Sequence, residues 1–211
     1  PSGSRVIVDP HMHVGEFPLF DVRLDRDGLV ALMDQHDYDG CVVFHPDNAL
    51  VEGILQTVPD AWGLVWANPR MPDGVEEAIR YLDHPRFVGV KLHPLLDGYH
   101  PDDPIVHPIY EAAIARDVPL LIHCGHPIFT LPWSIEEAVV AFPDLRLVLA
   151  HMGHGNIVYI HALIDVAARN PNAPLPIPRP MIRRRIGGSS SNRCPRPATD
   201  WELPLSKAES T

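Results

Sequence analysis

Apolar residues gather in short continuous runs, which alternate with segments whose apolar positions lie three and four residues apart. Continuous runs are typical of parallel strands buried on both faces of a sheet, and the second pattern is typical of amphipathic helices. Each apolar run is followed by a helical segment, commonly of about 10–15 residues, as in the βα units of parallel sheets. The predicted strands span residues 5–8, 41–44, 62–67, 87–92, 118–123 and 145–150.

Repeated βα units predict either a (β/α)8 barrel, which is the TIM-like fold, or a doubly wound sheet. The positions of the histidines favour the barrel. Six of them lie at or just after the carboxyl end of a predicted strand: His11, His13, His45, His93, His123 and His151. In a parallel barrel these strand ends converge on one face, whereas a doubly wound sheet would spread them along a line too long for one site. We therefore predict an α/β barrel.

The chain carries only about six βα units, so we expect the barrel to be incomplete. Residues 171–211 hold eight prolines, an RRR run and GGSSSN, with no strand-like segment. They carry 7 basic and 3 acidic side chains, against 10 basic and 24 acidic in residues 1–170. We predict a truncated barrel over 1–170 and a disordered tail over 171–211. One hypothesis is a shift of reading frame after Asn170, and the alternative is a natural tail on a shortened homologue.

The composition bounds the expected partners and location. A net charge of −10 argues against nucleic acid as the main partner, and a small molecule is expected instead. No stretch approaches the roughly 20 apolar residues of a membrane span, and the first residues lack the apolar core of a secretory signal. Three cysteines give no even disulfide framework, so we expect reduced thiols and a cytoplasmic protein.

Candidate chemistry begins with His11 and His13, whose side chains share one face of an extended chain. Neutral imidazole is the commonest metal ligand, and catalytic zinc takes three protein ligands and a water. His123 is a candidate third ligand, and His151 is a candidate further ligand or general base. An H-x-H pair by itself also fits a structural role, and His45 also fits a polar residue at a strand exit.

Two further candidates, Lys91 and His93, alternate at the end of the predicted strand 87–92. One should face the barrel interior and the other the helices, unless the strand ends between them. The remaining histidines are expected at the surface or in caps. They are His36, His84, His100, His107, His126, His154 and His161.

The motifs VDPHMH, GVKLHP, LLIHCG and LAHMG, in this order, resemble the amidohydrolase superfamily, in particular the amidohydrolase-related (amidohydrolase 2) family. The resemblance covers about residues 5–170. That family contains metal-dependent hydrolases and nonoxidative decarboxylases, and the resemblance implies a TIM-like barrel with a divalent metal, zinc. It implies that His11, His13 and His123 are the metal ligands. His151 would be the acid/base or, in a two-metal version, a further ligand.

By the same resemblance, Lys91 matches a lysine that is carboxylated and bridges two metals in some relatives and contacts substrate in others. His93 beside it is assigned to substrate binding. The family's last strand ends in an aspartate that binds the metal, and the matching segment is missing here. Asp200 is a poor substitute, because no strand precedes it.

Three functions remain open at this point. The first is a metal-dependent hydrolase of an ester, lactone or amide. The second is a nonoxidative decarboxylase that uses the same metal site, and the third is a barrel remnant without catalysis. A six-unit barrel would leave open sheet edges that pair with another chain, so a homo-oligomer is one expectation. We also expect low stability and little or no activity for this chain.

Overall fold

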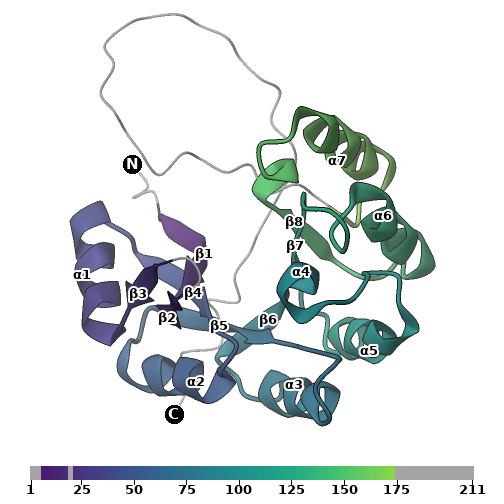
Figure 1. Cartoon of the computed structure of the whole chain (residues 1–211). Helices are drawn as coiled ribbons and strands as arrows, with labels where there is room; N and C mark the ends of the chain where they lie inside the picture. The colour runs from purple at the N-terminus through teal and green to yellow at the C-terminus, as the bar shows by residue number, and fades with distance from the viewer. Residues whose placement is uncertain (1–5, 19–20, 174–211) are drawn as a thin grey trace, which may run out of the picture. The chain divides into compact units, whose positions relative to one another are not determined.

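The computed structural model describes residues 6–18 and 21–173, which form a curved parallel sheet flanked by helices (Figure 1). Six strands lie side by side in the order in which they follow one another in the chain. They are β1 (Val8–His13), β4 (Gly40–Phe44), β5 (Ala61–Trp66), β6 (Phe87–Leu92), β7 (Leu120–His123) and β8 (Leu147–Ala150). Every neighbouring pair is parallel. This unbroken order is that of a barrel, because a doubly wound sheet reverses its order at a switch point.

A helix joins each strand to the next. The connecting helices are α1 (Arg26–His36), α2 (Asn48–Thr57), α3 (Gly74–Leu82), α4 (Pro94–Asp97), α5 (His107–Ala115) and α6 (Pro132–Ala141), and α7 (Ile157–Arg169) follows β8. Two short 3-10 helices are η2 (Pro104–Val106) and η3 (His151–Gly153). Several helices begin at a capping side chain, such as Asp47, which accepts from the N–H groups of Ala49 and Leu50.

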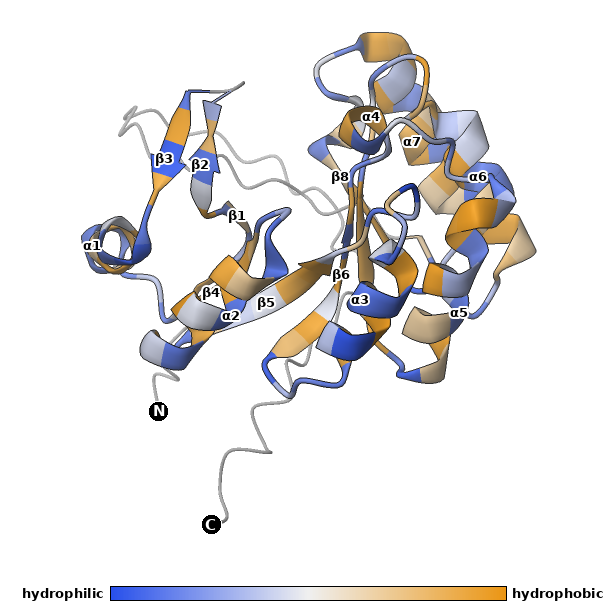
Figure 2. Cartoon of the chain, turned by 60° about the horizontal axis from the view of Figure 1, so that its bottom comes forward, coloured by the Kyte–Doolittle hydropathy of each residue, from blue (hydrophilic) through white to orange (hydrophobic). Residues whose placement is uncertain are grey.

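Both faces of the sheet are apolar. On β4, Cys41 and Val43 pack in the layer between the sheet and the helices, whereas Val42 and Phe44 pack on the opposite, inner face. The same alternation continues on β5, β7 and β8. Figure 2 shows the resulting apolar colouring of the strands beside helices of mixed polarity. Burial on both faces is the physical reason why these strands appear as continuous apolar runs in the sequence.

The amino ends of the strands share one repeated hydrogen bond. In each strand from β4 to β8, one backbone N–H donates to the carbonyl of a residue that ends the connection after the next helix. The pairs are Cys41–Asp60, Gly63–Arg86, Val90–Pro119, Leu120–Arg146 and Leu147–Asn172, at 3.0, 2.8, 3.0, 2.9 and 2.8 Å. The fifth pair joins β8 to the segment after α7, and Ala173 beyond it is fully buried. The ordered packing therefore extends to Ala173.

The predicted barrel class and its six βα units are confirmed, and the six strands form a half-barrel. One expectation about β1 was wrong. The predicted span 5–8 is displaced: β1 begins at Val8 and runs through Asp9-Pro10 to His13, with an irregular register between Asp9 and Met12. Within the part of the chain that the structure describes, β1 lies at an edge of the sheet. A proline is tolerated there because its missing N–H breaks no inner ladder.

A small antiparallel pair, β2 (Gly15–Phe17) and β3 (Val22–Leu24), was not predicted. Its three-residue strands are too short to show a hydrophobic period. Of the predicted tail over 171–211, residues 171–173 are described and packed against the sheet, and residues 174–211, which include Asp200, lie outside the described residues, as does Arg5 of the first predicted strand. Among the helices that the structure describes, none has the length and apolar character needed to cross a bilayer.

Candidate active site

Histidines from four strands meet at the carboxyl end of the sheet. His11 and His13 come from β1, His93 follows β6, His123 ends β7, and His151 follows β8. The ring centroids of His11 and His151 are 4.8 Å apart, and those of His151 and His123 are also 4.8 Å apart. His93 stacks on His123 at 4.0 Å, and His11 lies 5.5 Å from His13. The parallel order of the strands therefore brings five imidazoles into one continuous cluster.

Lys91 and His93 both belong to this cluster, because β6 ends at Leu92, between them. Lys91 is fully buried on the inner face, and its Nζ lies 5.0 Å from the centre of the Phe44 ring. His93 begins α4 instead of continuing the strand, and its ring stacks on Trp66 at 5.5 Å. The end of the strand thus places two alternating residues on the same side.

Burial keeps the imidazoles of the cluster uncharged. It lowers the pKa of His13 to about 4 and the pKa values of His93 and His151 to about 3, and the positive charge of Lys91 lowers all three further. Burial also lowers the pKa values of His11 and His123. The pKa of Lys91 itself falls to about 7, again because of burial. At neutral pH the five rings are therefore in the form that binds metals.

The hydrogen bonds fix one tautomer and leave other nitrogens without a partner. The backbone N–H of Leu96 donates to Nδ1 of His93 at 3.3 Å, which places the proton of that neutral ring on Nε2. Nε2 of His11, Nδ1 of His123 and Nζ of Lys91 are buried and have no hydrogen-bond partner. Buried polar atoms without partners are rare in folded proteins and call for an explanation.

The donor atoms suit zinc in kind, because they are neutral imidazole nitrogens and one of them, Nε2 of His11, is buried and unpaired. Across residues 6–18 and 21–173, however, no three His, Cys, Asp or Glu side chains already surround a common point in the manner of metal ligands. The roles predicted for His11, His13, His123, His151, Lys91 and His93 therefore stay predictions, although the structure brings all six together.

Aromatic side chains border the cluster on the β1 and β5 side. The ring of Phe44 lies 4.5 Å from that of His13, and Phe17 lies 5.0 Å from His13. Trp66 lies 6.3 Å from Phe17 and donates through Nε1 to Asp97 at 3.1 Å. Burial raises the pKa of Asp97 to about 7. The interior beside the histidines is thus apolar and aromatic, with one carboxyl group at its edge.

His45 lies at the edge of the cluster, where its ring is 5.0 Å from that of Phe17. Its Nδ1 accepts from the N–H of Asp47 at 3.0 Å, so its side chain stabilises the turn between β4 and α2. This contact supports the interpretation of His45 as a polar residue at a strand exit.

His126 was wrongly expected at the surface or in a cap. Its Nδ1 lies 2.9 Å from Nε2 of His123, and its ring is 4.0 Å from that of His154. The exposed His154 therefore also borders the cluster. The LLIHCGH and LAHMGH segments share the spacing H-x2-H, but this local pattern does not show that the two loops meet.

Solved structures with low sequence identity share the fold. An uncharacterised TIM-barrel protein from Bordetella bronchiseptica is 18% identical with a TM-score of 0.65, covering 81% of this chain and 74% of its own. An amidohydrolase from Burkholderia multivorans with bound zinc is 14% identical, with a TM-score of 0.61 and coverages of 81% and 69%. A 5-carboxyvanillate decarboxylase from Novosphingobium aromaticivorans with bound manganese is 16% identical, with a TM-score of 0.57 and coverages of 82% and 75%.

The chain spans between 66% and 80% of the lengths of these and further solved structures that it matches. Among curated proteins, no sequence matches it significantly. The model of the amidohydrolase 2 family, described as amidohydrolase, matches residues 8–190. This match covers most of the chain and includes every strand of the half-barrel and the whole histidine cluster. The chain belongs to this amidohydrolase family.

Proposed function

We propose that the protein is a metal-dependent hydrolase that acts on the carbonyl carbon of an ester, lactone or amide. The observation that carries the proposal is the cluster of five uncharged imidazoles around the buried Lys91, at the carboxyl end of a parallel sheet. Active sites of such barrels are built at this end. Membership of the amidohydrolase family supports a hydrolytic reaction.

A divalent ion, zinc, would be held by His11, His13 and His123. When bound, zinc supplies a water molecule of lowered pKa and polarises a substrate carbonyl. The zinc in the Burkholderia multivorans structure and the manganese in the Novosphingobium aromaticivorans structure support a divalent ion in this fold. The buried, unpaired Nε2 of His11 is consistent with such a ligand.

The other residues of the cluster have distinct roles in the proposed reaction. His151 is uncharged at neutral pH, so one of its ring nitrogens accepts a proton from the attacking water and later delivers it to the leaving group. His93 carries its proton on Nε2, because Leu96 donates to Nδ1, and this N–H binds a substrate oxygen. Nζ of Lys91 has no hydrogen-bond partner and would stabilise negative charge that develops on the substrate.

A decarboxylase that uses the same residues is the second candidate. The observation that favours it is the aromatic lining formed by Phe17, Phe44 and Trp66 next to His13 and His93. Such rings stack on an aromatic acid. The likeness of the fold to a 5-carboxyvanillate decarboxylase is consistent with this alternative.

The test compares the two reactions on one preparation. The full chain, loaded with zinc or manganese, is assayed for hydrolysis of a panel of lactones, esters and amides, and for release of carbon dioxide from aromatic acids. Metal-dependent hydrolysis supports the first candidate, and carbon dioxide release supports the second.

His151→Ala should lower the observed rate at least about 100-fold, the contribution of a general acid–base group. His161→Ala, in an exposed position on α7, is the matched control and should leave the rate unchanged. If the folded chain binds metal but catalyses neither reaction, it is a barrel remnant without catalysis and the proposal is wrong.

A further inference from the structure

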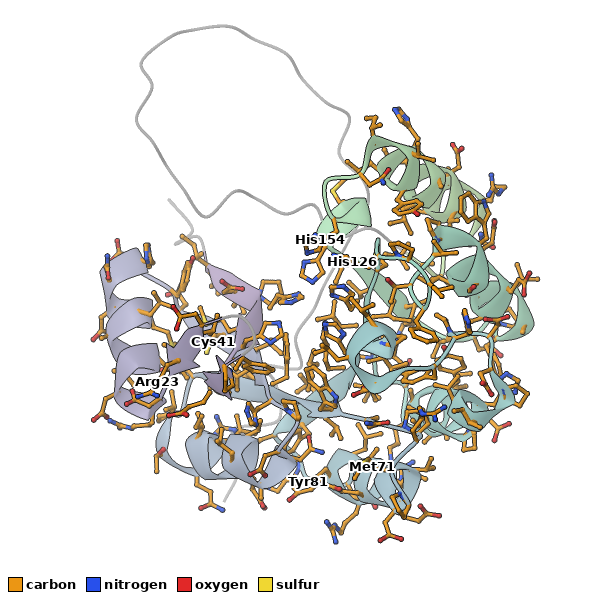
Figure 3. All side chains as sticks on the ribbon, viewed as in Figure 1. Arg23, Cys41, Met71, Tyr81, His126 and His154 are labelled. Atoms are coloured by element: carbon orange, nitrogen blue, oxygen red, sulfur yellow. The ribbon has the colours of Figure 1, made fainter. Side chains whose placement is uncertain are left out.

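A second group of imidazoles lies beside the cluster. His126 and His154 lie side by side at the carboxyl ends of β7 and β8 (Figure 3). Their ring centroids are 4.0 Å apart, and His123 lies 5.1 Å from His126 and 5.7 Å from His154. Neither His126 nor His154 has a role in the proposed hydrolase, and only His123 is common to both groups.

The backbone is shaped to bring this second group together. Gly125 has a φ of +103°, and a Cβ at this position would lie 2.3 Å from the carbonyl carbon of Gly153 and 2.7 Å from the backbone nitrogen of His154. Only glycine allows the loop after β7 to approach the loop after β8 so closely. This contact sets the residues that follow each glycine, His126 and His154, against each other.

The loop that carries His126 is also fixed from within. The hydroxyl of Thr130, which is fully buried, accepts from the N–H of His126 at 2.8 Å and donates to its carbonyl at 2.7 Å. The N–H of Thr130 donates to the same carbonyl at 3.1 Å, and the N–H of Gly125 donates to the carbonyl of Thr130 at 2.9 Å. The backbone of His126 is therefore held in place without any contribution from its side chain.

The segment that carries His154 has an uncommon backbone. Residues 151–155 all have positive φ, at 64°, 44°, 78°, 50° and 81°, and three of them are not glycine. A non-glycine residue in this region costs on the order of 1 kcal/mol, and such residues cluster at functional sites. This strained segment carries two histidines, His151 and His154, whose rings face His123 of β7.

The spacing of the nitrogens is close to that of two ligands of one ion. Nε2 of His123 and Nδ1 of His126 are 2.9 Å apart, so one proton lies between them. Two imidazoles on a tetrahedral zinc ion, with bonds of about 2.0–2.1 Å, place their nitrogens about 3.3 Å apart. An ion could therefore replace the shared proton with a small outward movement. His154 is exposed, so its ring is free to turn toward the same point.

We propose that His123, His126 and His154 form a binding site for a divalent transition-metal ion of the zinc, nickel or copper type. The donors are three imidazoles and no carboxylate, a set that suits these ions better than magnesium or calcium. The site shares His123 with the proposed hydrolase metal site but needs neither His11 nor His13, so it can be tested without the proposed reaction.

The experiment isolates the second site by removing the first pair of histidines. The full chain without a histidine tag, carrying His11→Leu and His13→Leu, is titrated with zinc alone by calorimetry. We expect one zinc ion per chain. Adding His126→Gln or His154→Asn should weaken binding at least about 10-fold, the smallest loss that substitutions around metal sites usually cause. Adding His161→Gln, on exposed α7, should change nothing.

The added substitutions should leave the chain folded. The hydrogen bonds between residues 126 and 130 involve only the backbone of His126, and asparagine tolerates the positive φ of His154. Circular dichroism checks that each variant keeps the parent's unfolding transition. Equal zinc affinity with and without His126 and His154 would overturn the proposal, as would a folded parent that binds no zinc.

A second measurement covers the case in which the parent variant does not fold. In the wild-type chain, zinc should shift the ring signals of His126 and His154 in histidine-selective NMR spectra. Shifts confined to His11, His13, His123 and His151 would also overturn the proposal.

Discussion

The two ends of the parallel sheet follow opposite rules. At the amino end, one backbone hydrogen bond repeats between successive units, and Gly89 packs so tightly that an added Cβ would lie 2.5 Å from the carbonyl oxygen of Pro119. At the carboxyl end, buried nitrogens of His11, His123 and Lys91 lack partners, and residues 151–155 have strained backbone. The backbone groups of these amino-end bonds are paired, and among the described residues near them only Nε of Arg86 is a buried side-chain atom without a partner, whereas the carboxyl end gathers several such nitrogens in one cluster.

This difference teaches how the fold separates stability from chemistry. Satisfied backbone groups and close packing hold the strands in register at the amino end. The cost of burying unpaired imidazoles and an unpaired ammonium group falls on the other end, where the histidine cluster lies. The comparison predicts that equivalent substitutions at the two ends have different effects.

The largest effect is expected for Lys91→Met, which removes the unpaired ammonium group and keeps the length of the side chain. Burial lowers the pKa of Lys91 to about 7 in the folded state, so the unfolded chain binds this proton more tightly between pH 7 and about 10.4. The cost to stability is fully present below pH 7 and disappears as the pH rises to about 10.4.

The Lys91→Met variant should therefore be more stable at pH 7 by on the order of 4 kcal/mol, because each pH unit between the two pKa values corresponds to about 1.4 kcal/mol. Urea unfolding at pH 7 and pH 10.5 measures the gain and its loss. A less stable variant at pH 7 would show that the ammonium group has a stabilising partner.

A pair of glycine substitutions compares the two ends directly. Gly89→Ala should lower the free energy of unfolding by about 1–3 kcal/mol, because the Cβ meets backbone at the amino end. Gly125→Ala should mainly displace the loops after β7 and β8 and leave the sheet intact. Hydrogen exchange should show lower protection across β5–β7 for the first variant and only in residues 124–130 and 151–155 for the second. Loss of protection throughout the sheet in both would contradict the comparison.

The pH dependence of stability distinguishes two groups at the carboxyl end. His93 has a folded-state pKa of about 3, so the unfolded state binds more protons between about pH 3 and 6.5 and stability rises with pH. His93→Gln should make this slope shallower by about 1 kcal/mol per pH unit. Asp97 has a folded-state pKa of about 7 and acts in the opposite direction, so Asp97→Asn should make the slope steeper between pH 4 and 7.

Urea unfolding of both variants and the wild type between pH 4 and 7 measures the slopes. The same change of slope in His93→Gln and Asp97→Asn would contradict the assignment of opposite signs.

The smallest effect is expected for Asn172→Ala at the amino end. The side chain of Asn172 donates to the carbonyls of Leu145, Val139 and Phe142 at 3.2, 3.4 and 3.4 Å. Its loss should lower the free energy of unfolding by about 1 kcal/mol, because these bonds are long. The backbone hydrogen bond from the N–H of Leu147 to the carbonyl of residue 172 remains in the variant. Thermal unfolding measures the change. An unchanged midpoint would show that ordered packing does not depend on this residue.

The strands and helices of the half-barrel could be predicted because burial on both faces produces unmistakable apolar runs, as in CVVF and FVGVKL. The β2–β3 pair could not, because three residues are too few to establish a period. The continuation of β1 through Pro10 could not be predicted either. It depends on the edge position of that strand, which only the assembled sheet reveals.

The gathering of His11, His13, His93, His123 and His151 followed from their positions at strand ends. The place of His126 did not, because it depends on a contact between Gly125 and Gly153, which are 28 positions apart in the sequence. A local sequence pattern predicts to which side of a strand a side chain points, but it does not predict which loops pack against each other. The ordered packing of Asn172 and Ala173 likewise arises from tertiary contacts.

The repeated backbone hydrogen bond at the amino ends of the strands has a consequence for how such a protein can change. Because this bond and the pairing of neighbouring strands set the register, the loops at the opposite end can vary in length and composition without shifting the strands. The segment between Leu92 and α5, which contains α4 and η2, or the loop between His123 and α6 could therefore be exchanged for one from another barrel while the register persists. Evolution and protein engineers can thus redesign the chemistry of this scaffold one loop at a time.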